Sequence, residues 1–220
     1  YTTACVGKWH LGLDWAGSDP AQGDVDFNEP VGGGPNQVGF DYFFGITASL
    51  DIPPYVYIEN DRITAIPDRY TESSTEMGWW RNGPTGADFQ HEEVLDRLTE
   101  KAVSFIEEHY KENPQKPFFL YFPLTAPHTP ILPLDRFRGS SGTNDYGDFV
   151  LQVDWTVGEI LKALNKHQLS QRTLIIFTSD NGCSPEADFE ELAQFGHDPS
   201  GGYRGAKADI FEGGHRIPFI

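Results

Sequence analysis

Apolar residues along this chain fall into two patterns, short unbroken runs and longer stretches with helical spacing. The clearest run extends from Leu174 to Phe177 between two threonines, and a second extends from Phe118 to Phe122. Unbroken runs of this length predict strands buried on both faces of a sheet. Shorter strands are predicted at 41–45 and 55–59, in a region that otherwise consists of loops.

Two stretches have apolar residues on one helical face. The first extends from Glu92 to Tyr110 and carries acidic residues in its first turns, where the helix dipole favours them. The second extends from Asp148 to Asn165 and leads into the Leu174 run. Strands and helices that alternate in this way predict an α/β fold, with a mainly parallel sheet sandwiched by helices and joined by right-handed crossovers.

The end of the Leu174 run carries the first candidate chemistry, the sequence Ser179-Asp180-Asn181-Gly182. In open α/β sheets ligands bind beyond the carboxyl ends of the strands, so Asp180 and Asn181 would project oxygen atoms into that crevice. Two adjacent oxygen ligands suit Ca²⁺ or Mg²⁺ better than zinc. The alternative is a turn that only ends the strand, because the same residue types dominate turns.

Basic and imidazole side chains occur in three further places. Lys8 and His10 would share one face of an extended segment, with Trp9 packed on the other side, and would suit an anion. His128 lies just beyond a predicted strand between two prolines and is a candidate acid or base. The alternatives are a surface lysine, a packed histidine and an ordinary loop histidine.

The glycine-rich stretch 201–216 combines five glycines with basic and imidazole side chains, among them Arg204 and Lys207. Glycine lets the backbone approach a ligand closely, so this stretch is the best candidate for a cationic pocket. The alternative is a solvated loop whose charges bind nothing specific. From Leu13 to about Gln90 the chain is rich in aromatic residues, which would form the rim of a substrate pocket or simply pack in the core.

The charge balance limits the partners. The 220 residues carry a formal net charge of −17, which argues against nucleic acid and an anionic membrane surface. No stretch approaches the roughly 20 apolar residues that a membrane span needs. An anionic substrate would therefore need a local cationic pocket. Two cysteines, Cys5 and Cys183, are too few for a disulfide scaffold or a thiolate metal site.

Taken together, these motifs resemble those of the type I sulfatases, which belong to the alkaline phosphatase superfamily. The resemblance covers nearly the whole chain, because four motifs occur in the family's order. They are Gly7-Lys8-Trp9-His10-Leu11-Gly12, Pro127-His128-Thr129-Pro130, Ser179-Asp180-Asn181-Gly182, and Arg204-Gly205-Ala206-Lys207 with Glu212-Gly213-Gly214-His215-Arg216-Ile217-Pro218.

The resemblance implies hydrolysis of a sulfate ester by a formylglycine made from a cysteine or serine. It implies that Asp180 and Asn181 bind the Ca²⁺, with Mg²⁺ as the alternative, that holds the sulfate oxygens. Lys8 and Lys207 would clamp the sulfate, with Arg204 as a further substrate-binding residue. His10 would assist the formylglycine hydrate, and His128 would protonate the leaving oxygen. It also implies a secreted, periplasmic or lysosomal location.

The chain departs from the family pattern at the nucleophile. No Cys or Ser followed by x-Pro-x-Arg is present, and the strand end that supplies the family's paired aspartates is missing too. Cys183-Ser184-Pro185-Glu186-Ala187 imitates the motif but has Ala187 in place of the arginine. We expect residues 1–220 to be part of one sulfatase catalytic domain, lacking the nucleophile region and the C-terminal subdomain, and to be inactive alone.

Two other functions stay open at this stage. A phosphate or phosphonate ester hydrolase of the same superfamily is one, although a Ser-Asp-His-Gly motif is typical of its two-metal members and this chain has Asn181. A non-catalytic relative that binds metal or glycan is the other. Among substrates, a small-molecule or oligosaccharide sulfate ester is expected, and sulfated carbohydrate is preferred over a small aryl sulfate.

Overall fold

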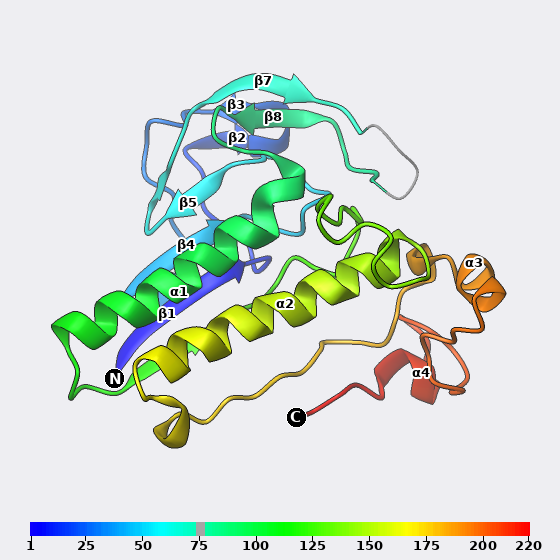
Figure 1. Cartoon of the computed structure of the whole chain (residues 1–220). Coiled ribbons are helices and arrows are strands. Elements are labelled where there is room, and N and C mark those ends of the chain that lie inside the picture. The colour runs from blue at the N-terminus through cyan, green and yellow to red at the C-terminus, as the bar shows by residue number, and fades with distance from the viewer. Residues whose placement is uncertain (74–77) are drawn as a thin grey trace.

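A five-stranded sheet in the order β6-β5-β4-β1-β9 forms the centre of the computed structural model, which describes residues 1–73 and 78–220 (Figure 1). β1 pairs in parallel with both β4 and β9, whereas β4–β5 and β5–β6 are antiparallel, so the sheet is mixed. The strands are β1 (Thr2–Lys8), β4 (Tyr42–Ile46), β5 (Tyr57–Glu59), β6 (Arg62–Ile63) and β9 (Phe118–Tyr121).

Two long helices, α1 (Val94–Glu112) and α2 (Asp145–Lys166), lie on the same face of this sheet and pack against each other (Figure 1). The apolar face predicted for α1 is the buried one, with Leu95, Leu98 and Ile106 in the core. Helix α2 begins at Asp145 because Asn144 caps it, with a side-chain oxygen that accepts a hydrogen bond from the Gly147 N–H. The predicted α/β class is confirmed, with the helices on one face.

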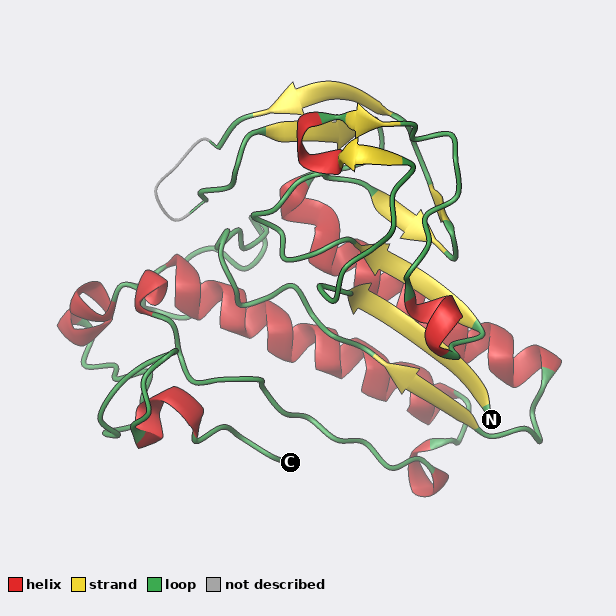
Figure 2. Cartoon of the chain, turned by 180° about the vertical axis from the view of Figure 1, so that it is seen from behind, coloured by secondary structure: helices red, strands yellow, loops and turns green. Residues whose placement is uncertain are grey.

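The two faces of the sheet have separate cores because side chains alternate along a strand. Val6 and Phe44 point towards α1 and join one hydrophobic cluster. Cys5 and Phe43 point the other way into a second cluster, which is covered by loop residues instead of a long helix. Figure 2 shows that second face.

Two small antiparallel ribbons lie beyond β5, namely β2 (Gly17–Asp19) with β3 (Asp24–Val25), and β7 (Pro67–Thr71) with β8 (Gly83–Gly86). The aromatic residues between Tyr42 and Trp80 mostly do not form the rim that we expected. Tyr55, Tyr57 and Trp80 are buried in the core, where their large apolar surfaces are removed from water. The expectation of an aromatic rim from these three residues was wrong.

The segment 173–177 is the main departure from the predicted elements. It is extended but is not a strand, and Leu174 is 85% and Ile176 55% exposed. A strand needs a hydrogen-bonded neighbour, and in the described parts of the chain this segment finds one only at its end, where Phe177 and Ile220 exchange backbone hydrogen bonds of 2.9 and 3.0 Å. It runs past α2 without joining the edge of β9 (Figure 1).

The remaining helices are short. They comprise the 3₁₀ helices Pro20–Gln22, Pro35–Val38, His91–Glu93, Ser170–Arg172 and Pro185–Ala187, together with α3 (Phe189–Gln194) and α4 (Glu212–His215). None of the helices found in residues 1–73 and 78–220 has the length and hydrophobicity of a membrane-spanning helix.

Candidate functional site

The carboxyl end of β1 carries Lys8 and, two residues later, His10. The Lys8 N–H donates to the Pro123 carbonyl at 3.0 Å and the His10 N–H to the Thr47 carbonyl at 3.1 Å, so the end of β1 is held by the loops that follow β9 and β4. Gly7 permits this approach, because a Cβ there would lie 2.0 Å from the Pro123 oxygen. His10 is not extended, since its φ is 55°.

His128 lies in the loop that follows β9 and is half-buried. Its Nδ1 lies 2.6 Å from the Thr129 carbonyl oxygen, so Nδ1 donates this bond and the ring orientation is held. The Nε2 atom has no protein partner in the part of the chain that the structure describes. The loop thus presents a histidine with one ring nitrogen held and the other available to a ligand.

The glycine-rich stretch folds back onto the Asp180 turn. The Gly182 N–H donates to the Gly214 carbonyl and the Lys207 N–H to the Cys183 carbonyl, both at 2.9 Å. A Cβ on Gly182 would lie 1.8 Å from the Gly213 oxygen, so only glycine allows the two backbones to cross this closely. These contacts place Lys207 beside the turn that carries Asp180.

Electrostatic interactions connect the three segments into one cluster. Burial lowers the pKa of Lys8, and the nearby Lys207 lowers it further while Asp180 raises it. Burial and then Lys8 lower the pKa of His10, with smaller effects in the same direction from His128 and Lys207. Lys8 and His10 thus interact with each other, and Asp180, Lys207 and His128 each lie within electrostatic reach of at least one of them. Their catalytic roles stay predictions.

Arg204 is placed differently from the other predicted residues. Its guanidinium lies over the Phe211 ring at 3.6 Å from the centroid, in a cation–π contact. Within the described residues it is not among the charges that act on Lys8 or His10. The structure thus gives Arg204 a packing contact and does not bring it into the cluster.

The predicted metal ligands, Asp180 and Asn181, are adjacent and supply hard oxygen donors of the kind that Ca²⁺ or Mg²⁺ takes. Across residues 1–73 and 78–220, no three His, Cys, Asp or Glu side chains gather into a metal-binding group. Because Ca²⁺ takes about six to eight oxygen ligands, this pair fits the chemistry of the ion but accounts for only part of a coordination shell.

Asp51 belongs to the cluster although the sequence analysis did not identify it. It is buried, accepts a hydrogen bond of 2.7 Å from Ser49 Oγ and pairs with Arg81. Its charge acts to raise the pKa of both Lys8 and His10, which partly balances the local positive charge. Its position in the loop after β4 was the available signal, since functional groups gather beyond strand ends.

The two cysteines have no nucleophile-like surroundings. Burial raises the pKa of Cys5 to about 12 and also raises the pKa of Cys183, so both favour the neutral thiol. The Cys183 Sγ contacts the Tyr146 hydroxyl at 3.2 Å. Cys183 therefore resembles the nucleophile motif in part of its sequence, but its surroundings do not activate the thiol.

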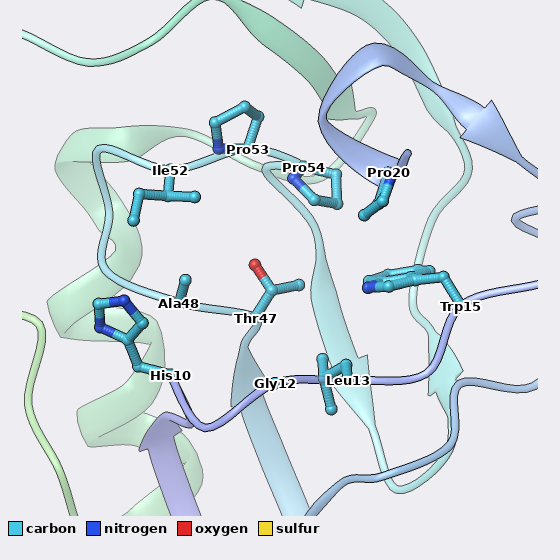
Figure 3. Close-up of a pocket in the computed structure, with 10 residues that line it drawn as sticks. All are labelled: His10, Gly12, Leu13, Trp15, Pro20, Thr47, Ala48, Ile52, Pro53 and Pro54. Atoms are coloured by element: carbon cyan, nitrogen blue, oxygen red, sulfur yellow. The ribbon is translucent and has the colours of Figure 1, made fainter. Parts of the chain in front are cut away.

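A cavity of about 260 Å³ opens beside His10, which forms one of its walls (Figure 3). It is lined by residues that follow β1 and β4. They are His10, Gly12, Leu13, Trp15, Pro20, Thr47, Ala48, Ile52, Pro53 and Pro54. The cavity and the charged cluster thus share one histidine, so that a ligand held in the cluster would have the cavity as its neighbour.

Comparison with known proteins gives consistent matches. A family model described as Sulfatase matches residues 1–220. An N-acetylgalactosamine-6-O-sulfatase of Bacteroides thetaiotaomicron is 36% identical over 100% of this chain and 48% of its own length. An N-acetylgalactosamine-6-sulfatase of Mus musculus is 31% identical over 100% of this chain and 37% of its own.

A solved structure described under the metabolism of multiple glycosaminoglycans by Bacteroides thetaiotaomicron superposes with a TM-score of 0.79 at 35% identity. The match covers 100% of this chain and 52% of that one. The chain therefore spans about half the length of that structure and of the Bacteroides relative, and less of the mouse relative.

Proposed function

The chain belongs to the sulfatase family, and from this premise we propose that the whole protein hydrolyses a sulfate monoester of a carbohydrate. Two relatives named for N-acetylgalactosamine 6-sulfate favour a sulfated amino sugar. We also propose that residues 1–220 form part of a single catalytic domain, in line with a match that covers the whole chain but about half of the relative.

The observation that carries this proposal is the charged cluster at the carboxyl end of β1. The protein has a net charge of −17, yet Lys8, Lys207 and His128 all lie within electrostatic reach of His10. Neighbouring cations lower the pKa of Lys8 and of His10, so the arrangement is costly unless an anion binds there. A sulfate group would relieve that repulsion.

The two lysines would hold the sulfate oxygens. Each Nζ offers up to three donors, and both interactions strengthen as negative charge develops in the transition state. Burial of Lys8 makes this effect larger than at an exposed site, because charges interact more strongly where water is excluded. The lysines thus bind the substrate and also lower the barrier.

The two histidines would act as general acid and general base. The Nδ1 atom of His128 is already used on the Thr129 carbonyl, so only Nε2 can donate to the leaving oxygen, and the ring must then be doubly protonated. Burial lowers the pKa of His10, so more of this side chain is neutral and able to accept a proton. His10 would therefore accept a proton from the nucleophile's hydroxyl while His128 donates one.

Asp180 and Asn181 would contribute oxygen ligands to a Ca²⁺, with Mg²⁺ as the alternative, and the bound ion would supply Lewis-acid polarisation of the sulfate. The nucleophile expected from the family is a formylglycine from a motif that these 220 residues do not contain. A secreted, periplasmic or lysosomal location stays a prediction.

The test uses the complete enzyme with N-acetylgalactosamine 6-sulfate, and measures sulfate release beside release of phosphate from the matching 6-phosphate. We expect sulfate release to be at least 100-fold faster, on the order of what one well-placed transition-state interaction supplies. Faster phosphate release would replace the proposal by phosphate ester hydrolysis. Binding without either reaction would indicate a non-catalytic relative.

A further inference from the structure

We propose that the cavity beside His10 is a subsite for one neutral sugar ring of the substrate, and that Trp15 and Thr47 are the residues that select this ring. The inference rests on the proposed sulfate ester hydrolysis and deepens it. The cluster around Lys8 and Lys207 would hold the sulfate, and the cavity would hold the sugar to which the sulfate is attached.

The position of the cavity supports this assignment. His10 lines the cavity and also interacts electrostatically with Lys8 and Lys207, so the two sites meet at one side chain. Ligand pockets for drug-sized molecules measure about 300–1,000 Å³. A cavity of about 260 Å³ is therefore suited to a single ring instead of an oligosaccharide, and longer chains would extend into solvent.

The polar atoms in the cavity are few and have no protein partners. Figure 3 shows the Thr47 hydroxyl and the indole nitrogen of Trp15 directed into the cavity. In the described parts of the chain, neither atom takes part in a hydrogen bond, and neither is sealed from solvent. An indole N–H only donates, whereas a hydroxyl donates and accepts. Together they match the hydroxyl or acetamido groups of a sugar.

The rest of the lining is apolar, with Leu13, Ile52 and Pro54 among its walls (Figure 3). A pyranose ring has apolar C–H faces and polar edges, and such a ring fits apolar walls that carry a few placed polar groups. Among the described residues, no Asp, Glu, Lys or Arg lines the cavity, while Asp51 lies near its His10 side. A neutral sugar is therefore favoured over a uronic acid, because these lining residues offer its carboxylate no Lys or Arg partner.

The cavity walls are held before any ligand arrives. Thr47 is buried, and its carbonyl accepts the His10 N–H. Trp15 packs edge-on against Phe27, with centroids 5.6 Å apart. Pro53 lies so close to Gly83 that a Cβ on Gly83 would approach it to 2.2 Å. A preformed wall lowers the entropic cost of binding, as a specificity site requires.

The experiment compares two substrates in the complete enzyme, N-acetylgalactosamine 6-sulfate and a small aryl sulfate that lacks a sugar. Thr47→Val removes the hydroxyl at nearly constant shape, and Trp15→Phe removes the indole N–H but keeps an aromatic ring. We expect each variant to reduce the ratio of kcat/KM for the sugar over the aryl sulfate by about fivefold to tenfold, as for one lost hydrogen bond. The loss should be mainly in KM.

Trp79→Phe is the matched control, because Trp79 is an exposed tryptophan that does not line the cavity, and it should leave both substrates unchanged. An equal loss on both substrates in Thr47→Val and Trp15→Phe would overturn the proposal, since it would show a general structural role. An unchanged ratio would overturn it as well.

Binding of unsulfated N-acetylgalactosamine, followed by ligand-detected NMR, separates this proposal from the proposed function. We expect a signal with the unaltered protein that is weakened in Thr47→Val. If the protein hydrolyses neither sulfate ester but gives this pattern, the reaction is wrong and the sugar site stands. If it hydrolyses the sulfated sugar but shows no binding difference, the subsite is wrong and the reaction stands.

Discussion

The segments 2–8 and 173–177 are both extended, but only the first is a strand held inside the sheet. In β1, Val6 is fully buried because β4 and β9 pair with its two edges and α1 covers one face. The run that starts at Leu174 gains no such neighbours in the described residues and stays largely exposed. Apolar composition therefore indicates a capacity for burial, and the neighbours decide whether burial occurs.

Both regions nevertheless contribute to the same candidate site. The β1 region supplies Lys8 and His10. Pairing with β4 holds the strand up to Lys8, and backbone hydrogen bonds hold the two residues at its end. The segment 173–177 leads into the turn that carries Asp180, and close backbone crossings at glycines, among them Gly182, bring Lys207 beside that turn. A residue can therefore be positioned by a few local backbone contacts where a sheet does not hold it.

The largest expected effect is a difference between the two regions in how much a substitution lowers the free energy of unfolding. Phe43→Ala, in the strand β4 that pairs with β1, should lower the free energy of unfolding by about 3–5 kcal/mol, because Phe43 is completely buried and its removal leaves a cavity. Leu174→Ala, at an exposed position, should cost less than about 0.5 kcal/mol. Urea denaturation measures both. A cost at Leu174 that approaches the cost at Phe43 would show that this run is buried in solution and would break the comparison.

The next effect tests whether the regions share one site. Lys8→Ala and Lys207→Ala should each raise the activation barrier of the complete enzyme by about 3 kcal/mol, as for the loss of one oxyanion donor. Steady-state kinetics measures the change, and the double variant should lose less than the sum because the residues act on one group. Lys162→Ala, whose partner Glu159 is on the same helix, is the control. Unchanged kinetics in Lys207→Ala would remove that residue from the sulfate clamp.

A smaller effect concerns acid stability, which we locate at His91 in the 3₁₀ helix before α1, against the hydrophobic cluster that Val6 of β1 joins. His91 packs between Trp80 and Tyr55, and burial lowers its pKa from 6.5 to about 3. The unfolded chain therefore binds a proton between pH 6.5 and pH 3 that the folded chain does not, and stability falls as the pH falls through this window. The loss from pH 7 to pH 5 should be about 2 kcal/mol.

Denaturation at a series of pH values measures this dependence, and His91→Phe should flatten it below pH 6.5. Stability that varies with pH in the same way with and without His91 would contradict the prediction. In that case the acid-sensitive group would have to be sought elsewhere, including the Asp180 region.

The smallest effect lies at the junction between α2 and the second region. Asn144 caps α2 and donates hydrogen bonds to the Ala187 carbonyl at 2.9 Å and to Glu191 at 2.8 Å. Asn144→Ala should lower the free energy of unfolding by about 1 kcal/mol, which thermal denaturation measures as a lower melting temperature. In Asn144→Ala, amide hydrogen exchange should become faster in residues 185–194. Asn144→Ser should keep the helix cap but lose the hydrogen bonds to Ala187 and Glu191. Unchanged exchange in that segment would mean that Asn144 serves only α2.

The sequence alone determined the elements and motifs that depend on local pattern. The helical spacing of Leu95, Leu98 and Ile106 predicted α1, because a helix face is a property of nearby residues. The run at Phe118 predicted the strand β9, but its expected burial on both faces was wrong, since Phe119 and Tyr121 are exposed. The candidate ligands Asp180 and Lys207 were found in the same way, from short motifs. Their order along the chain was enough to indicate the family.

Only the tertiary structure decided which segments become neighbours. It left the Leu174 run exposed, placed Arg204 over Phe211, and brought Asp51 into the cluster. It also formed the cavity from Trp15 and Thr47, which lie on different loops. The physical reason is that burial, cavities and electrostatic interactions depend on distances between residues far apart in the chain, and no local pattern contains those distances.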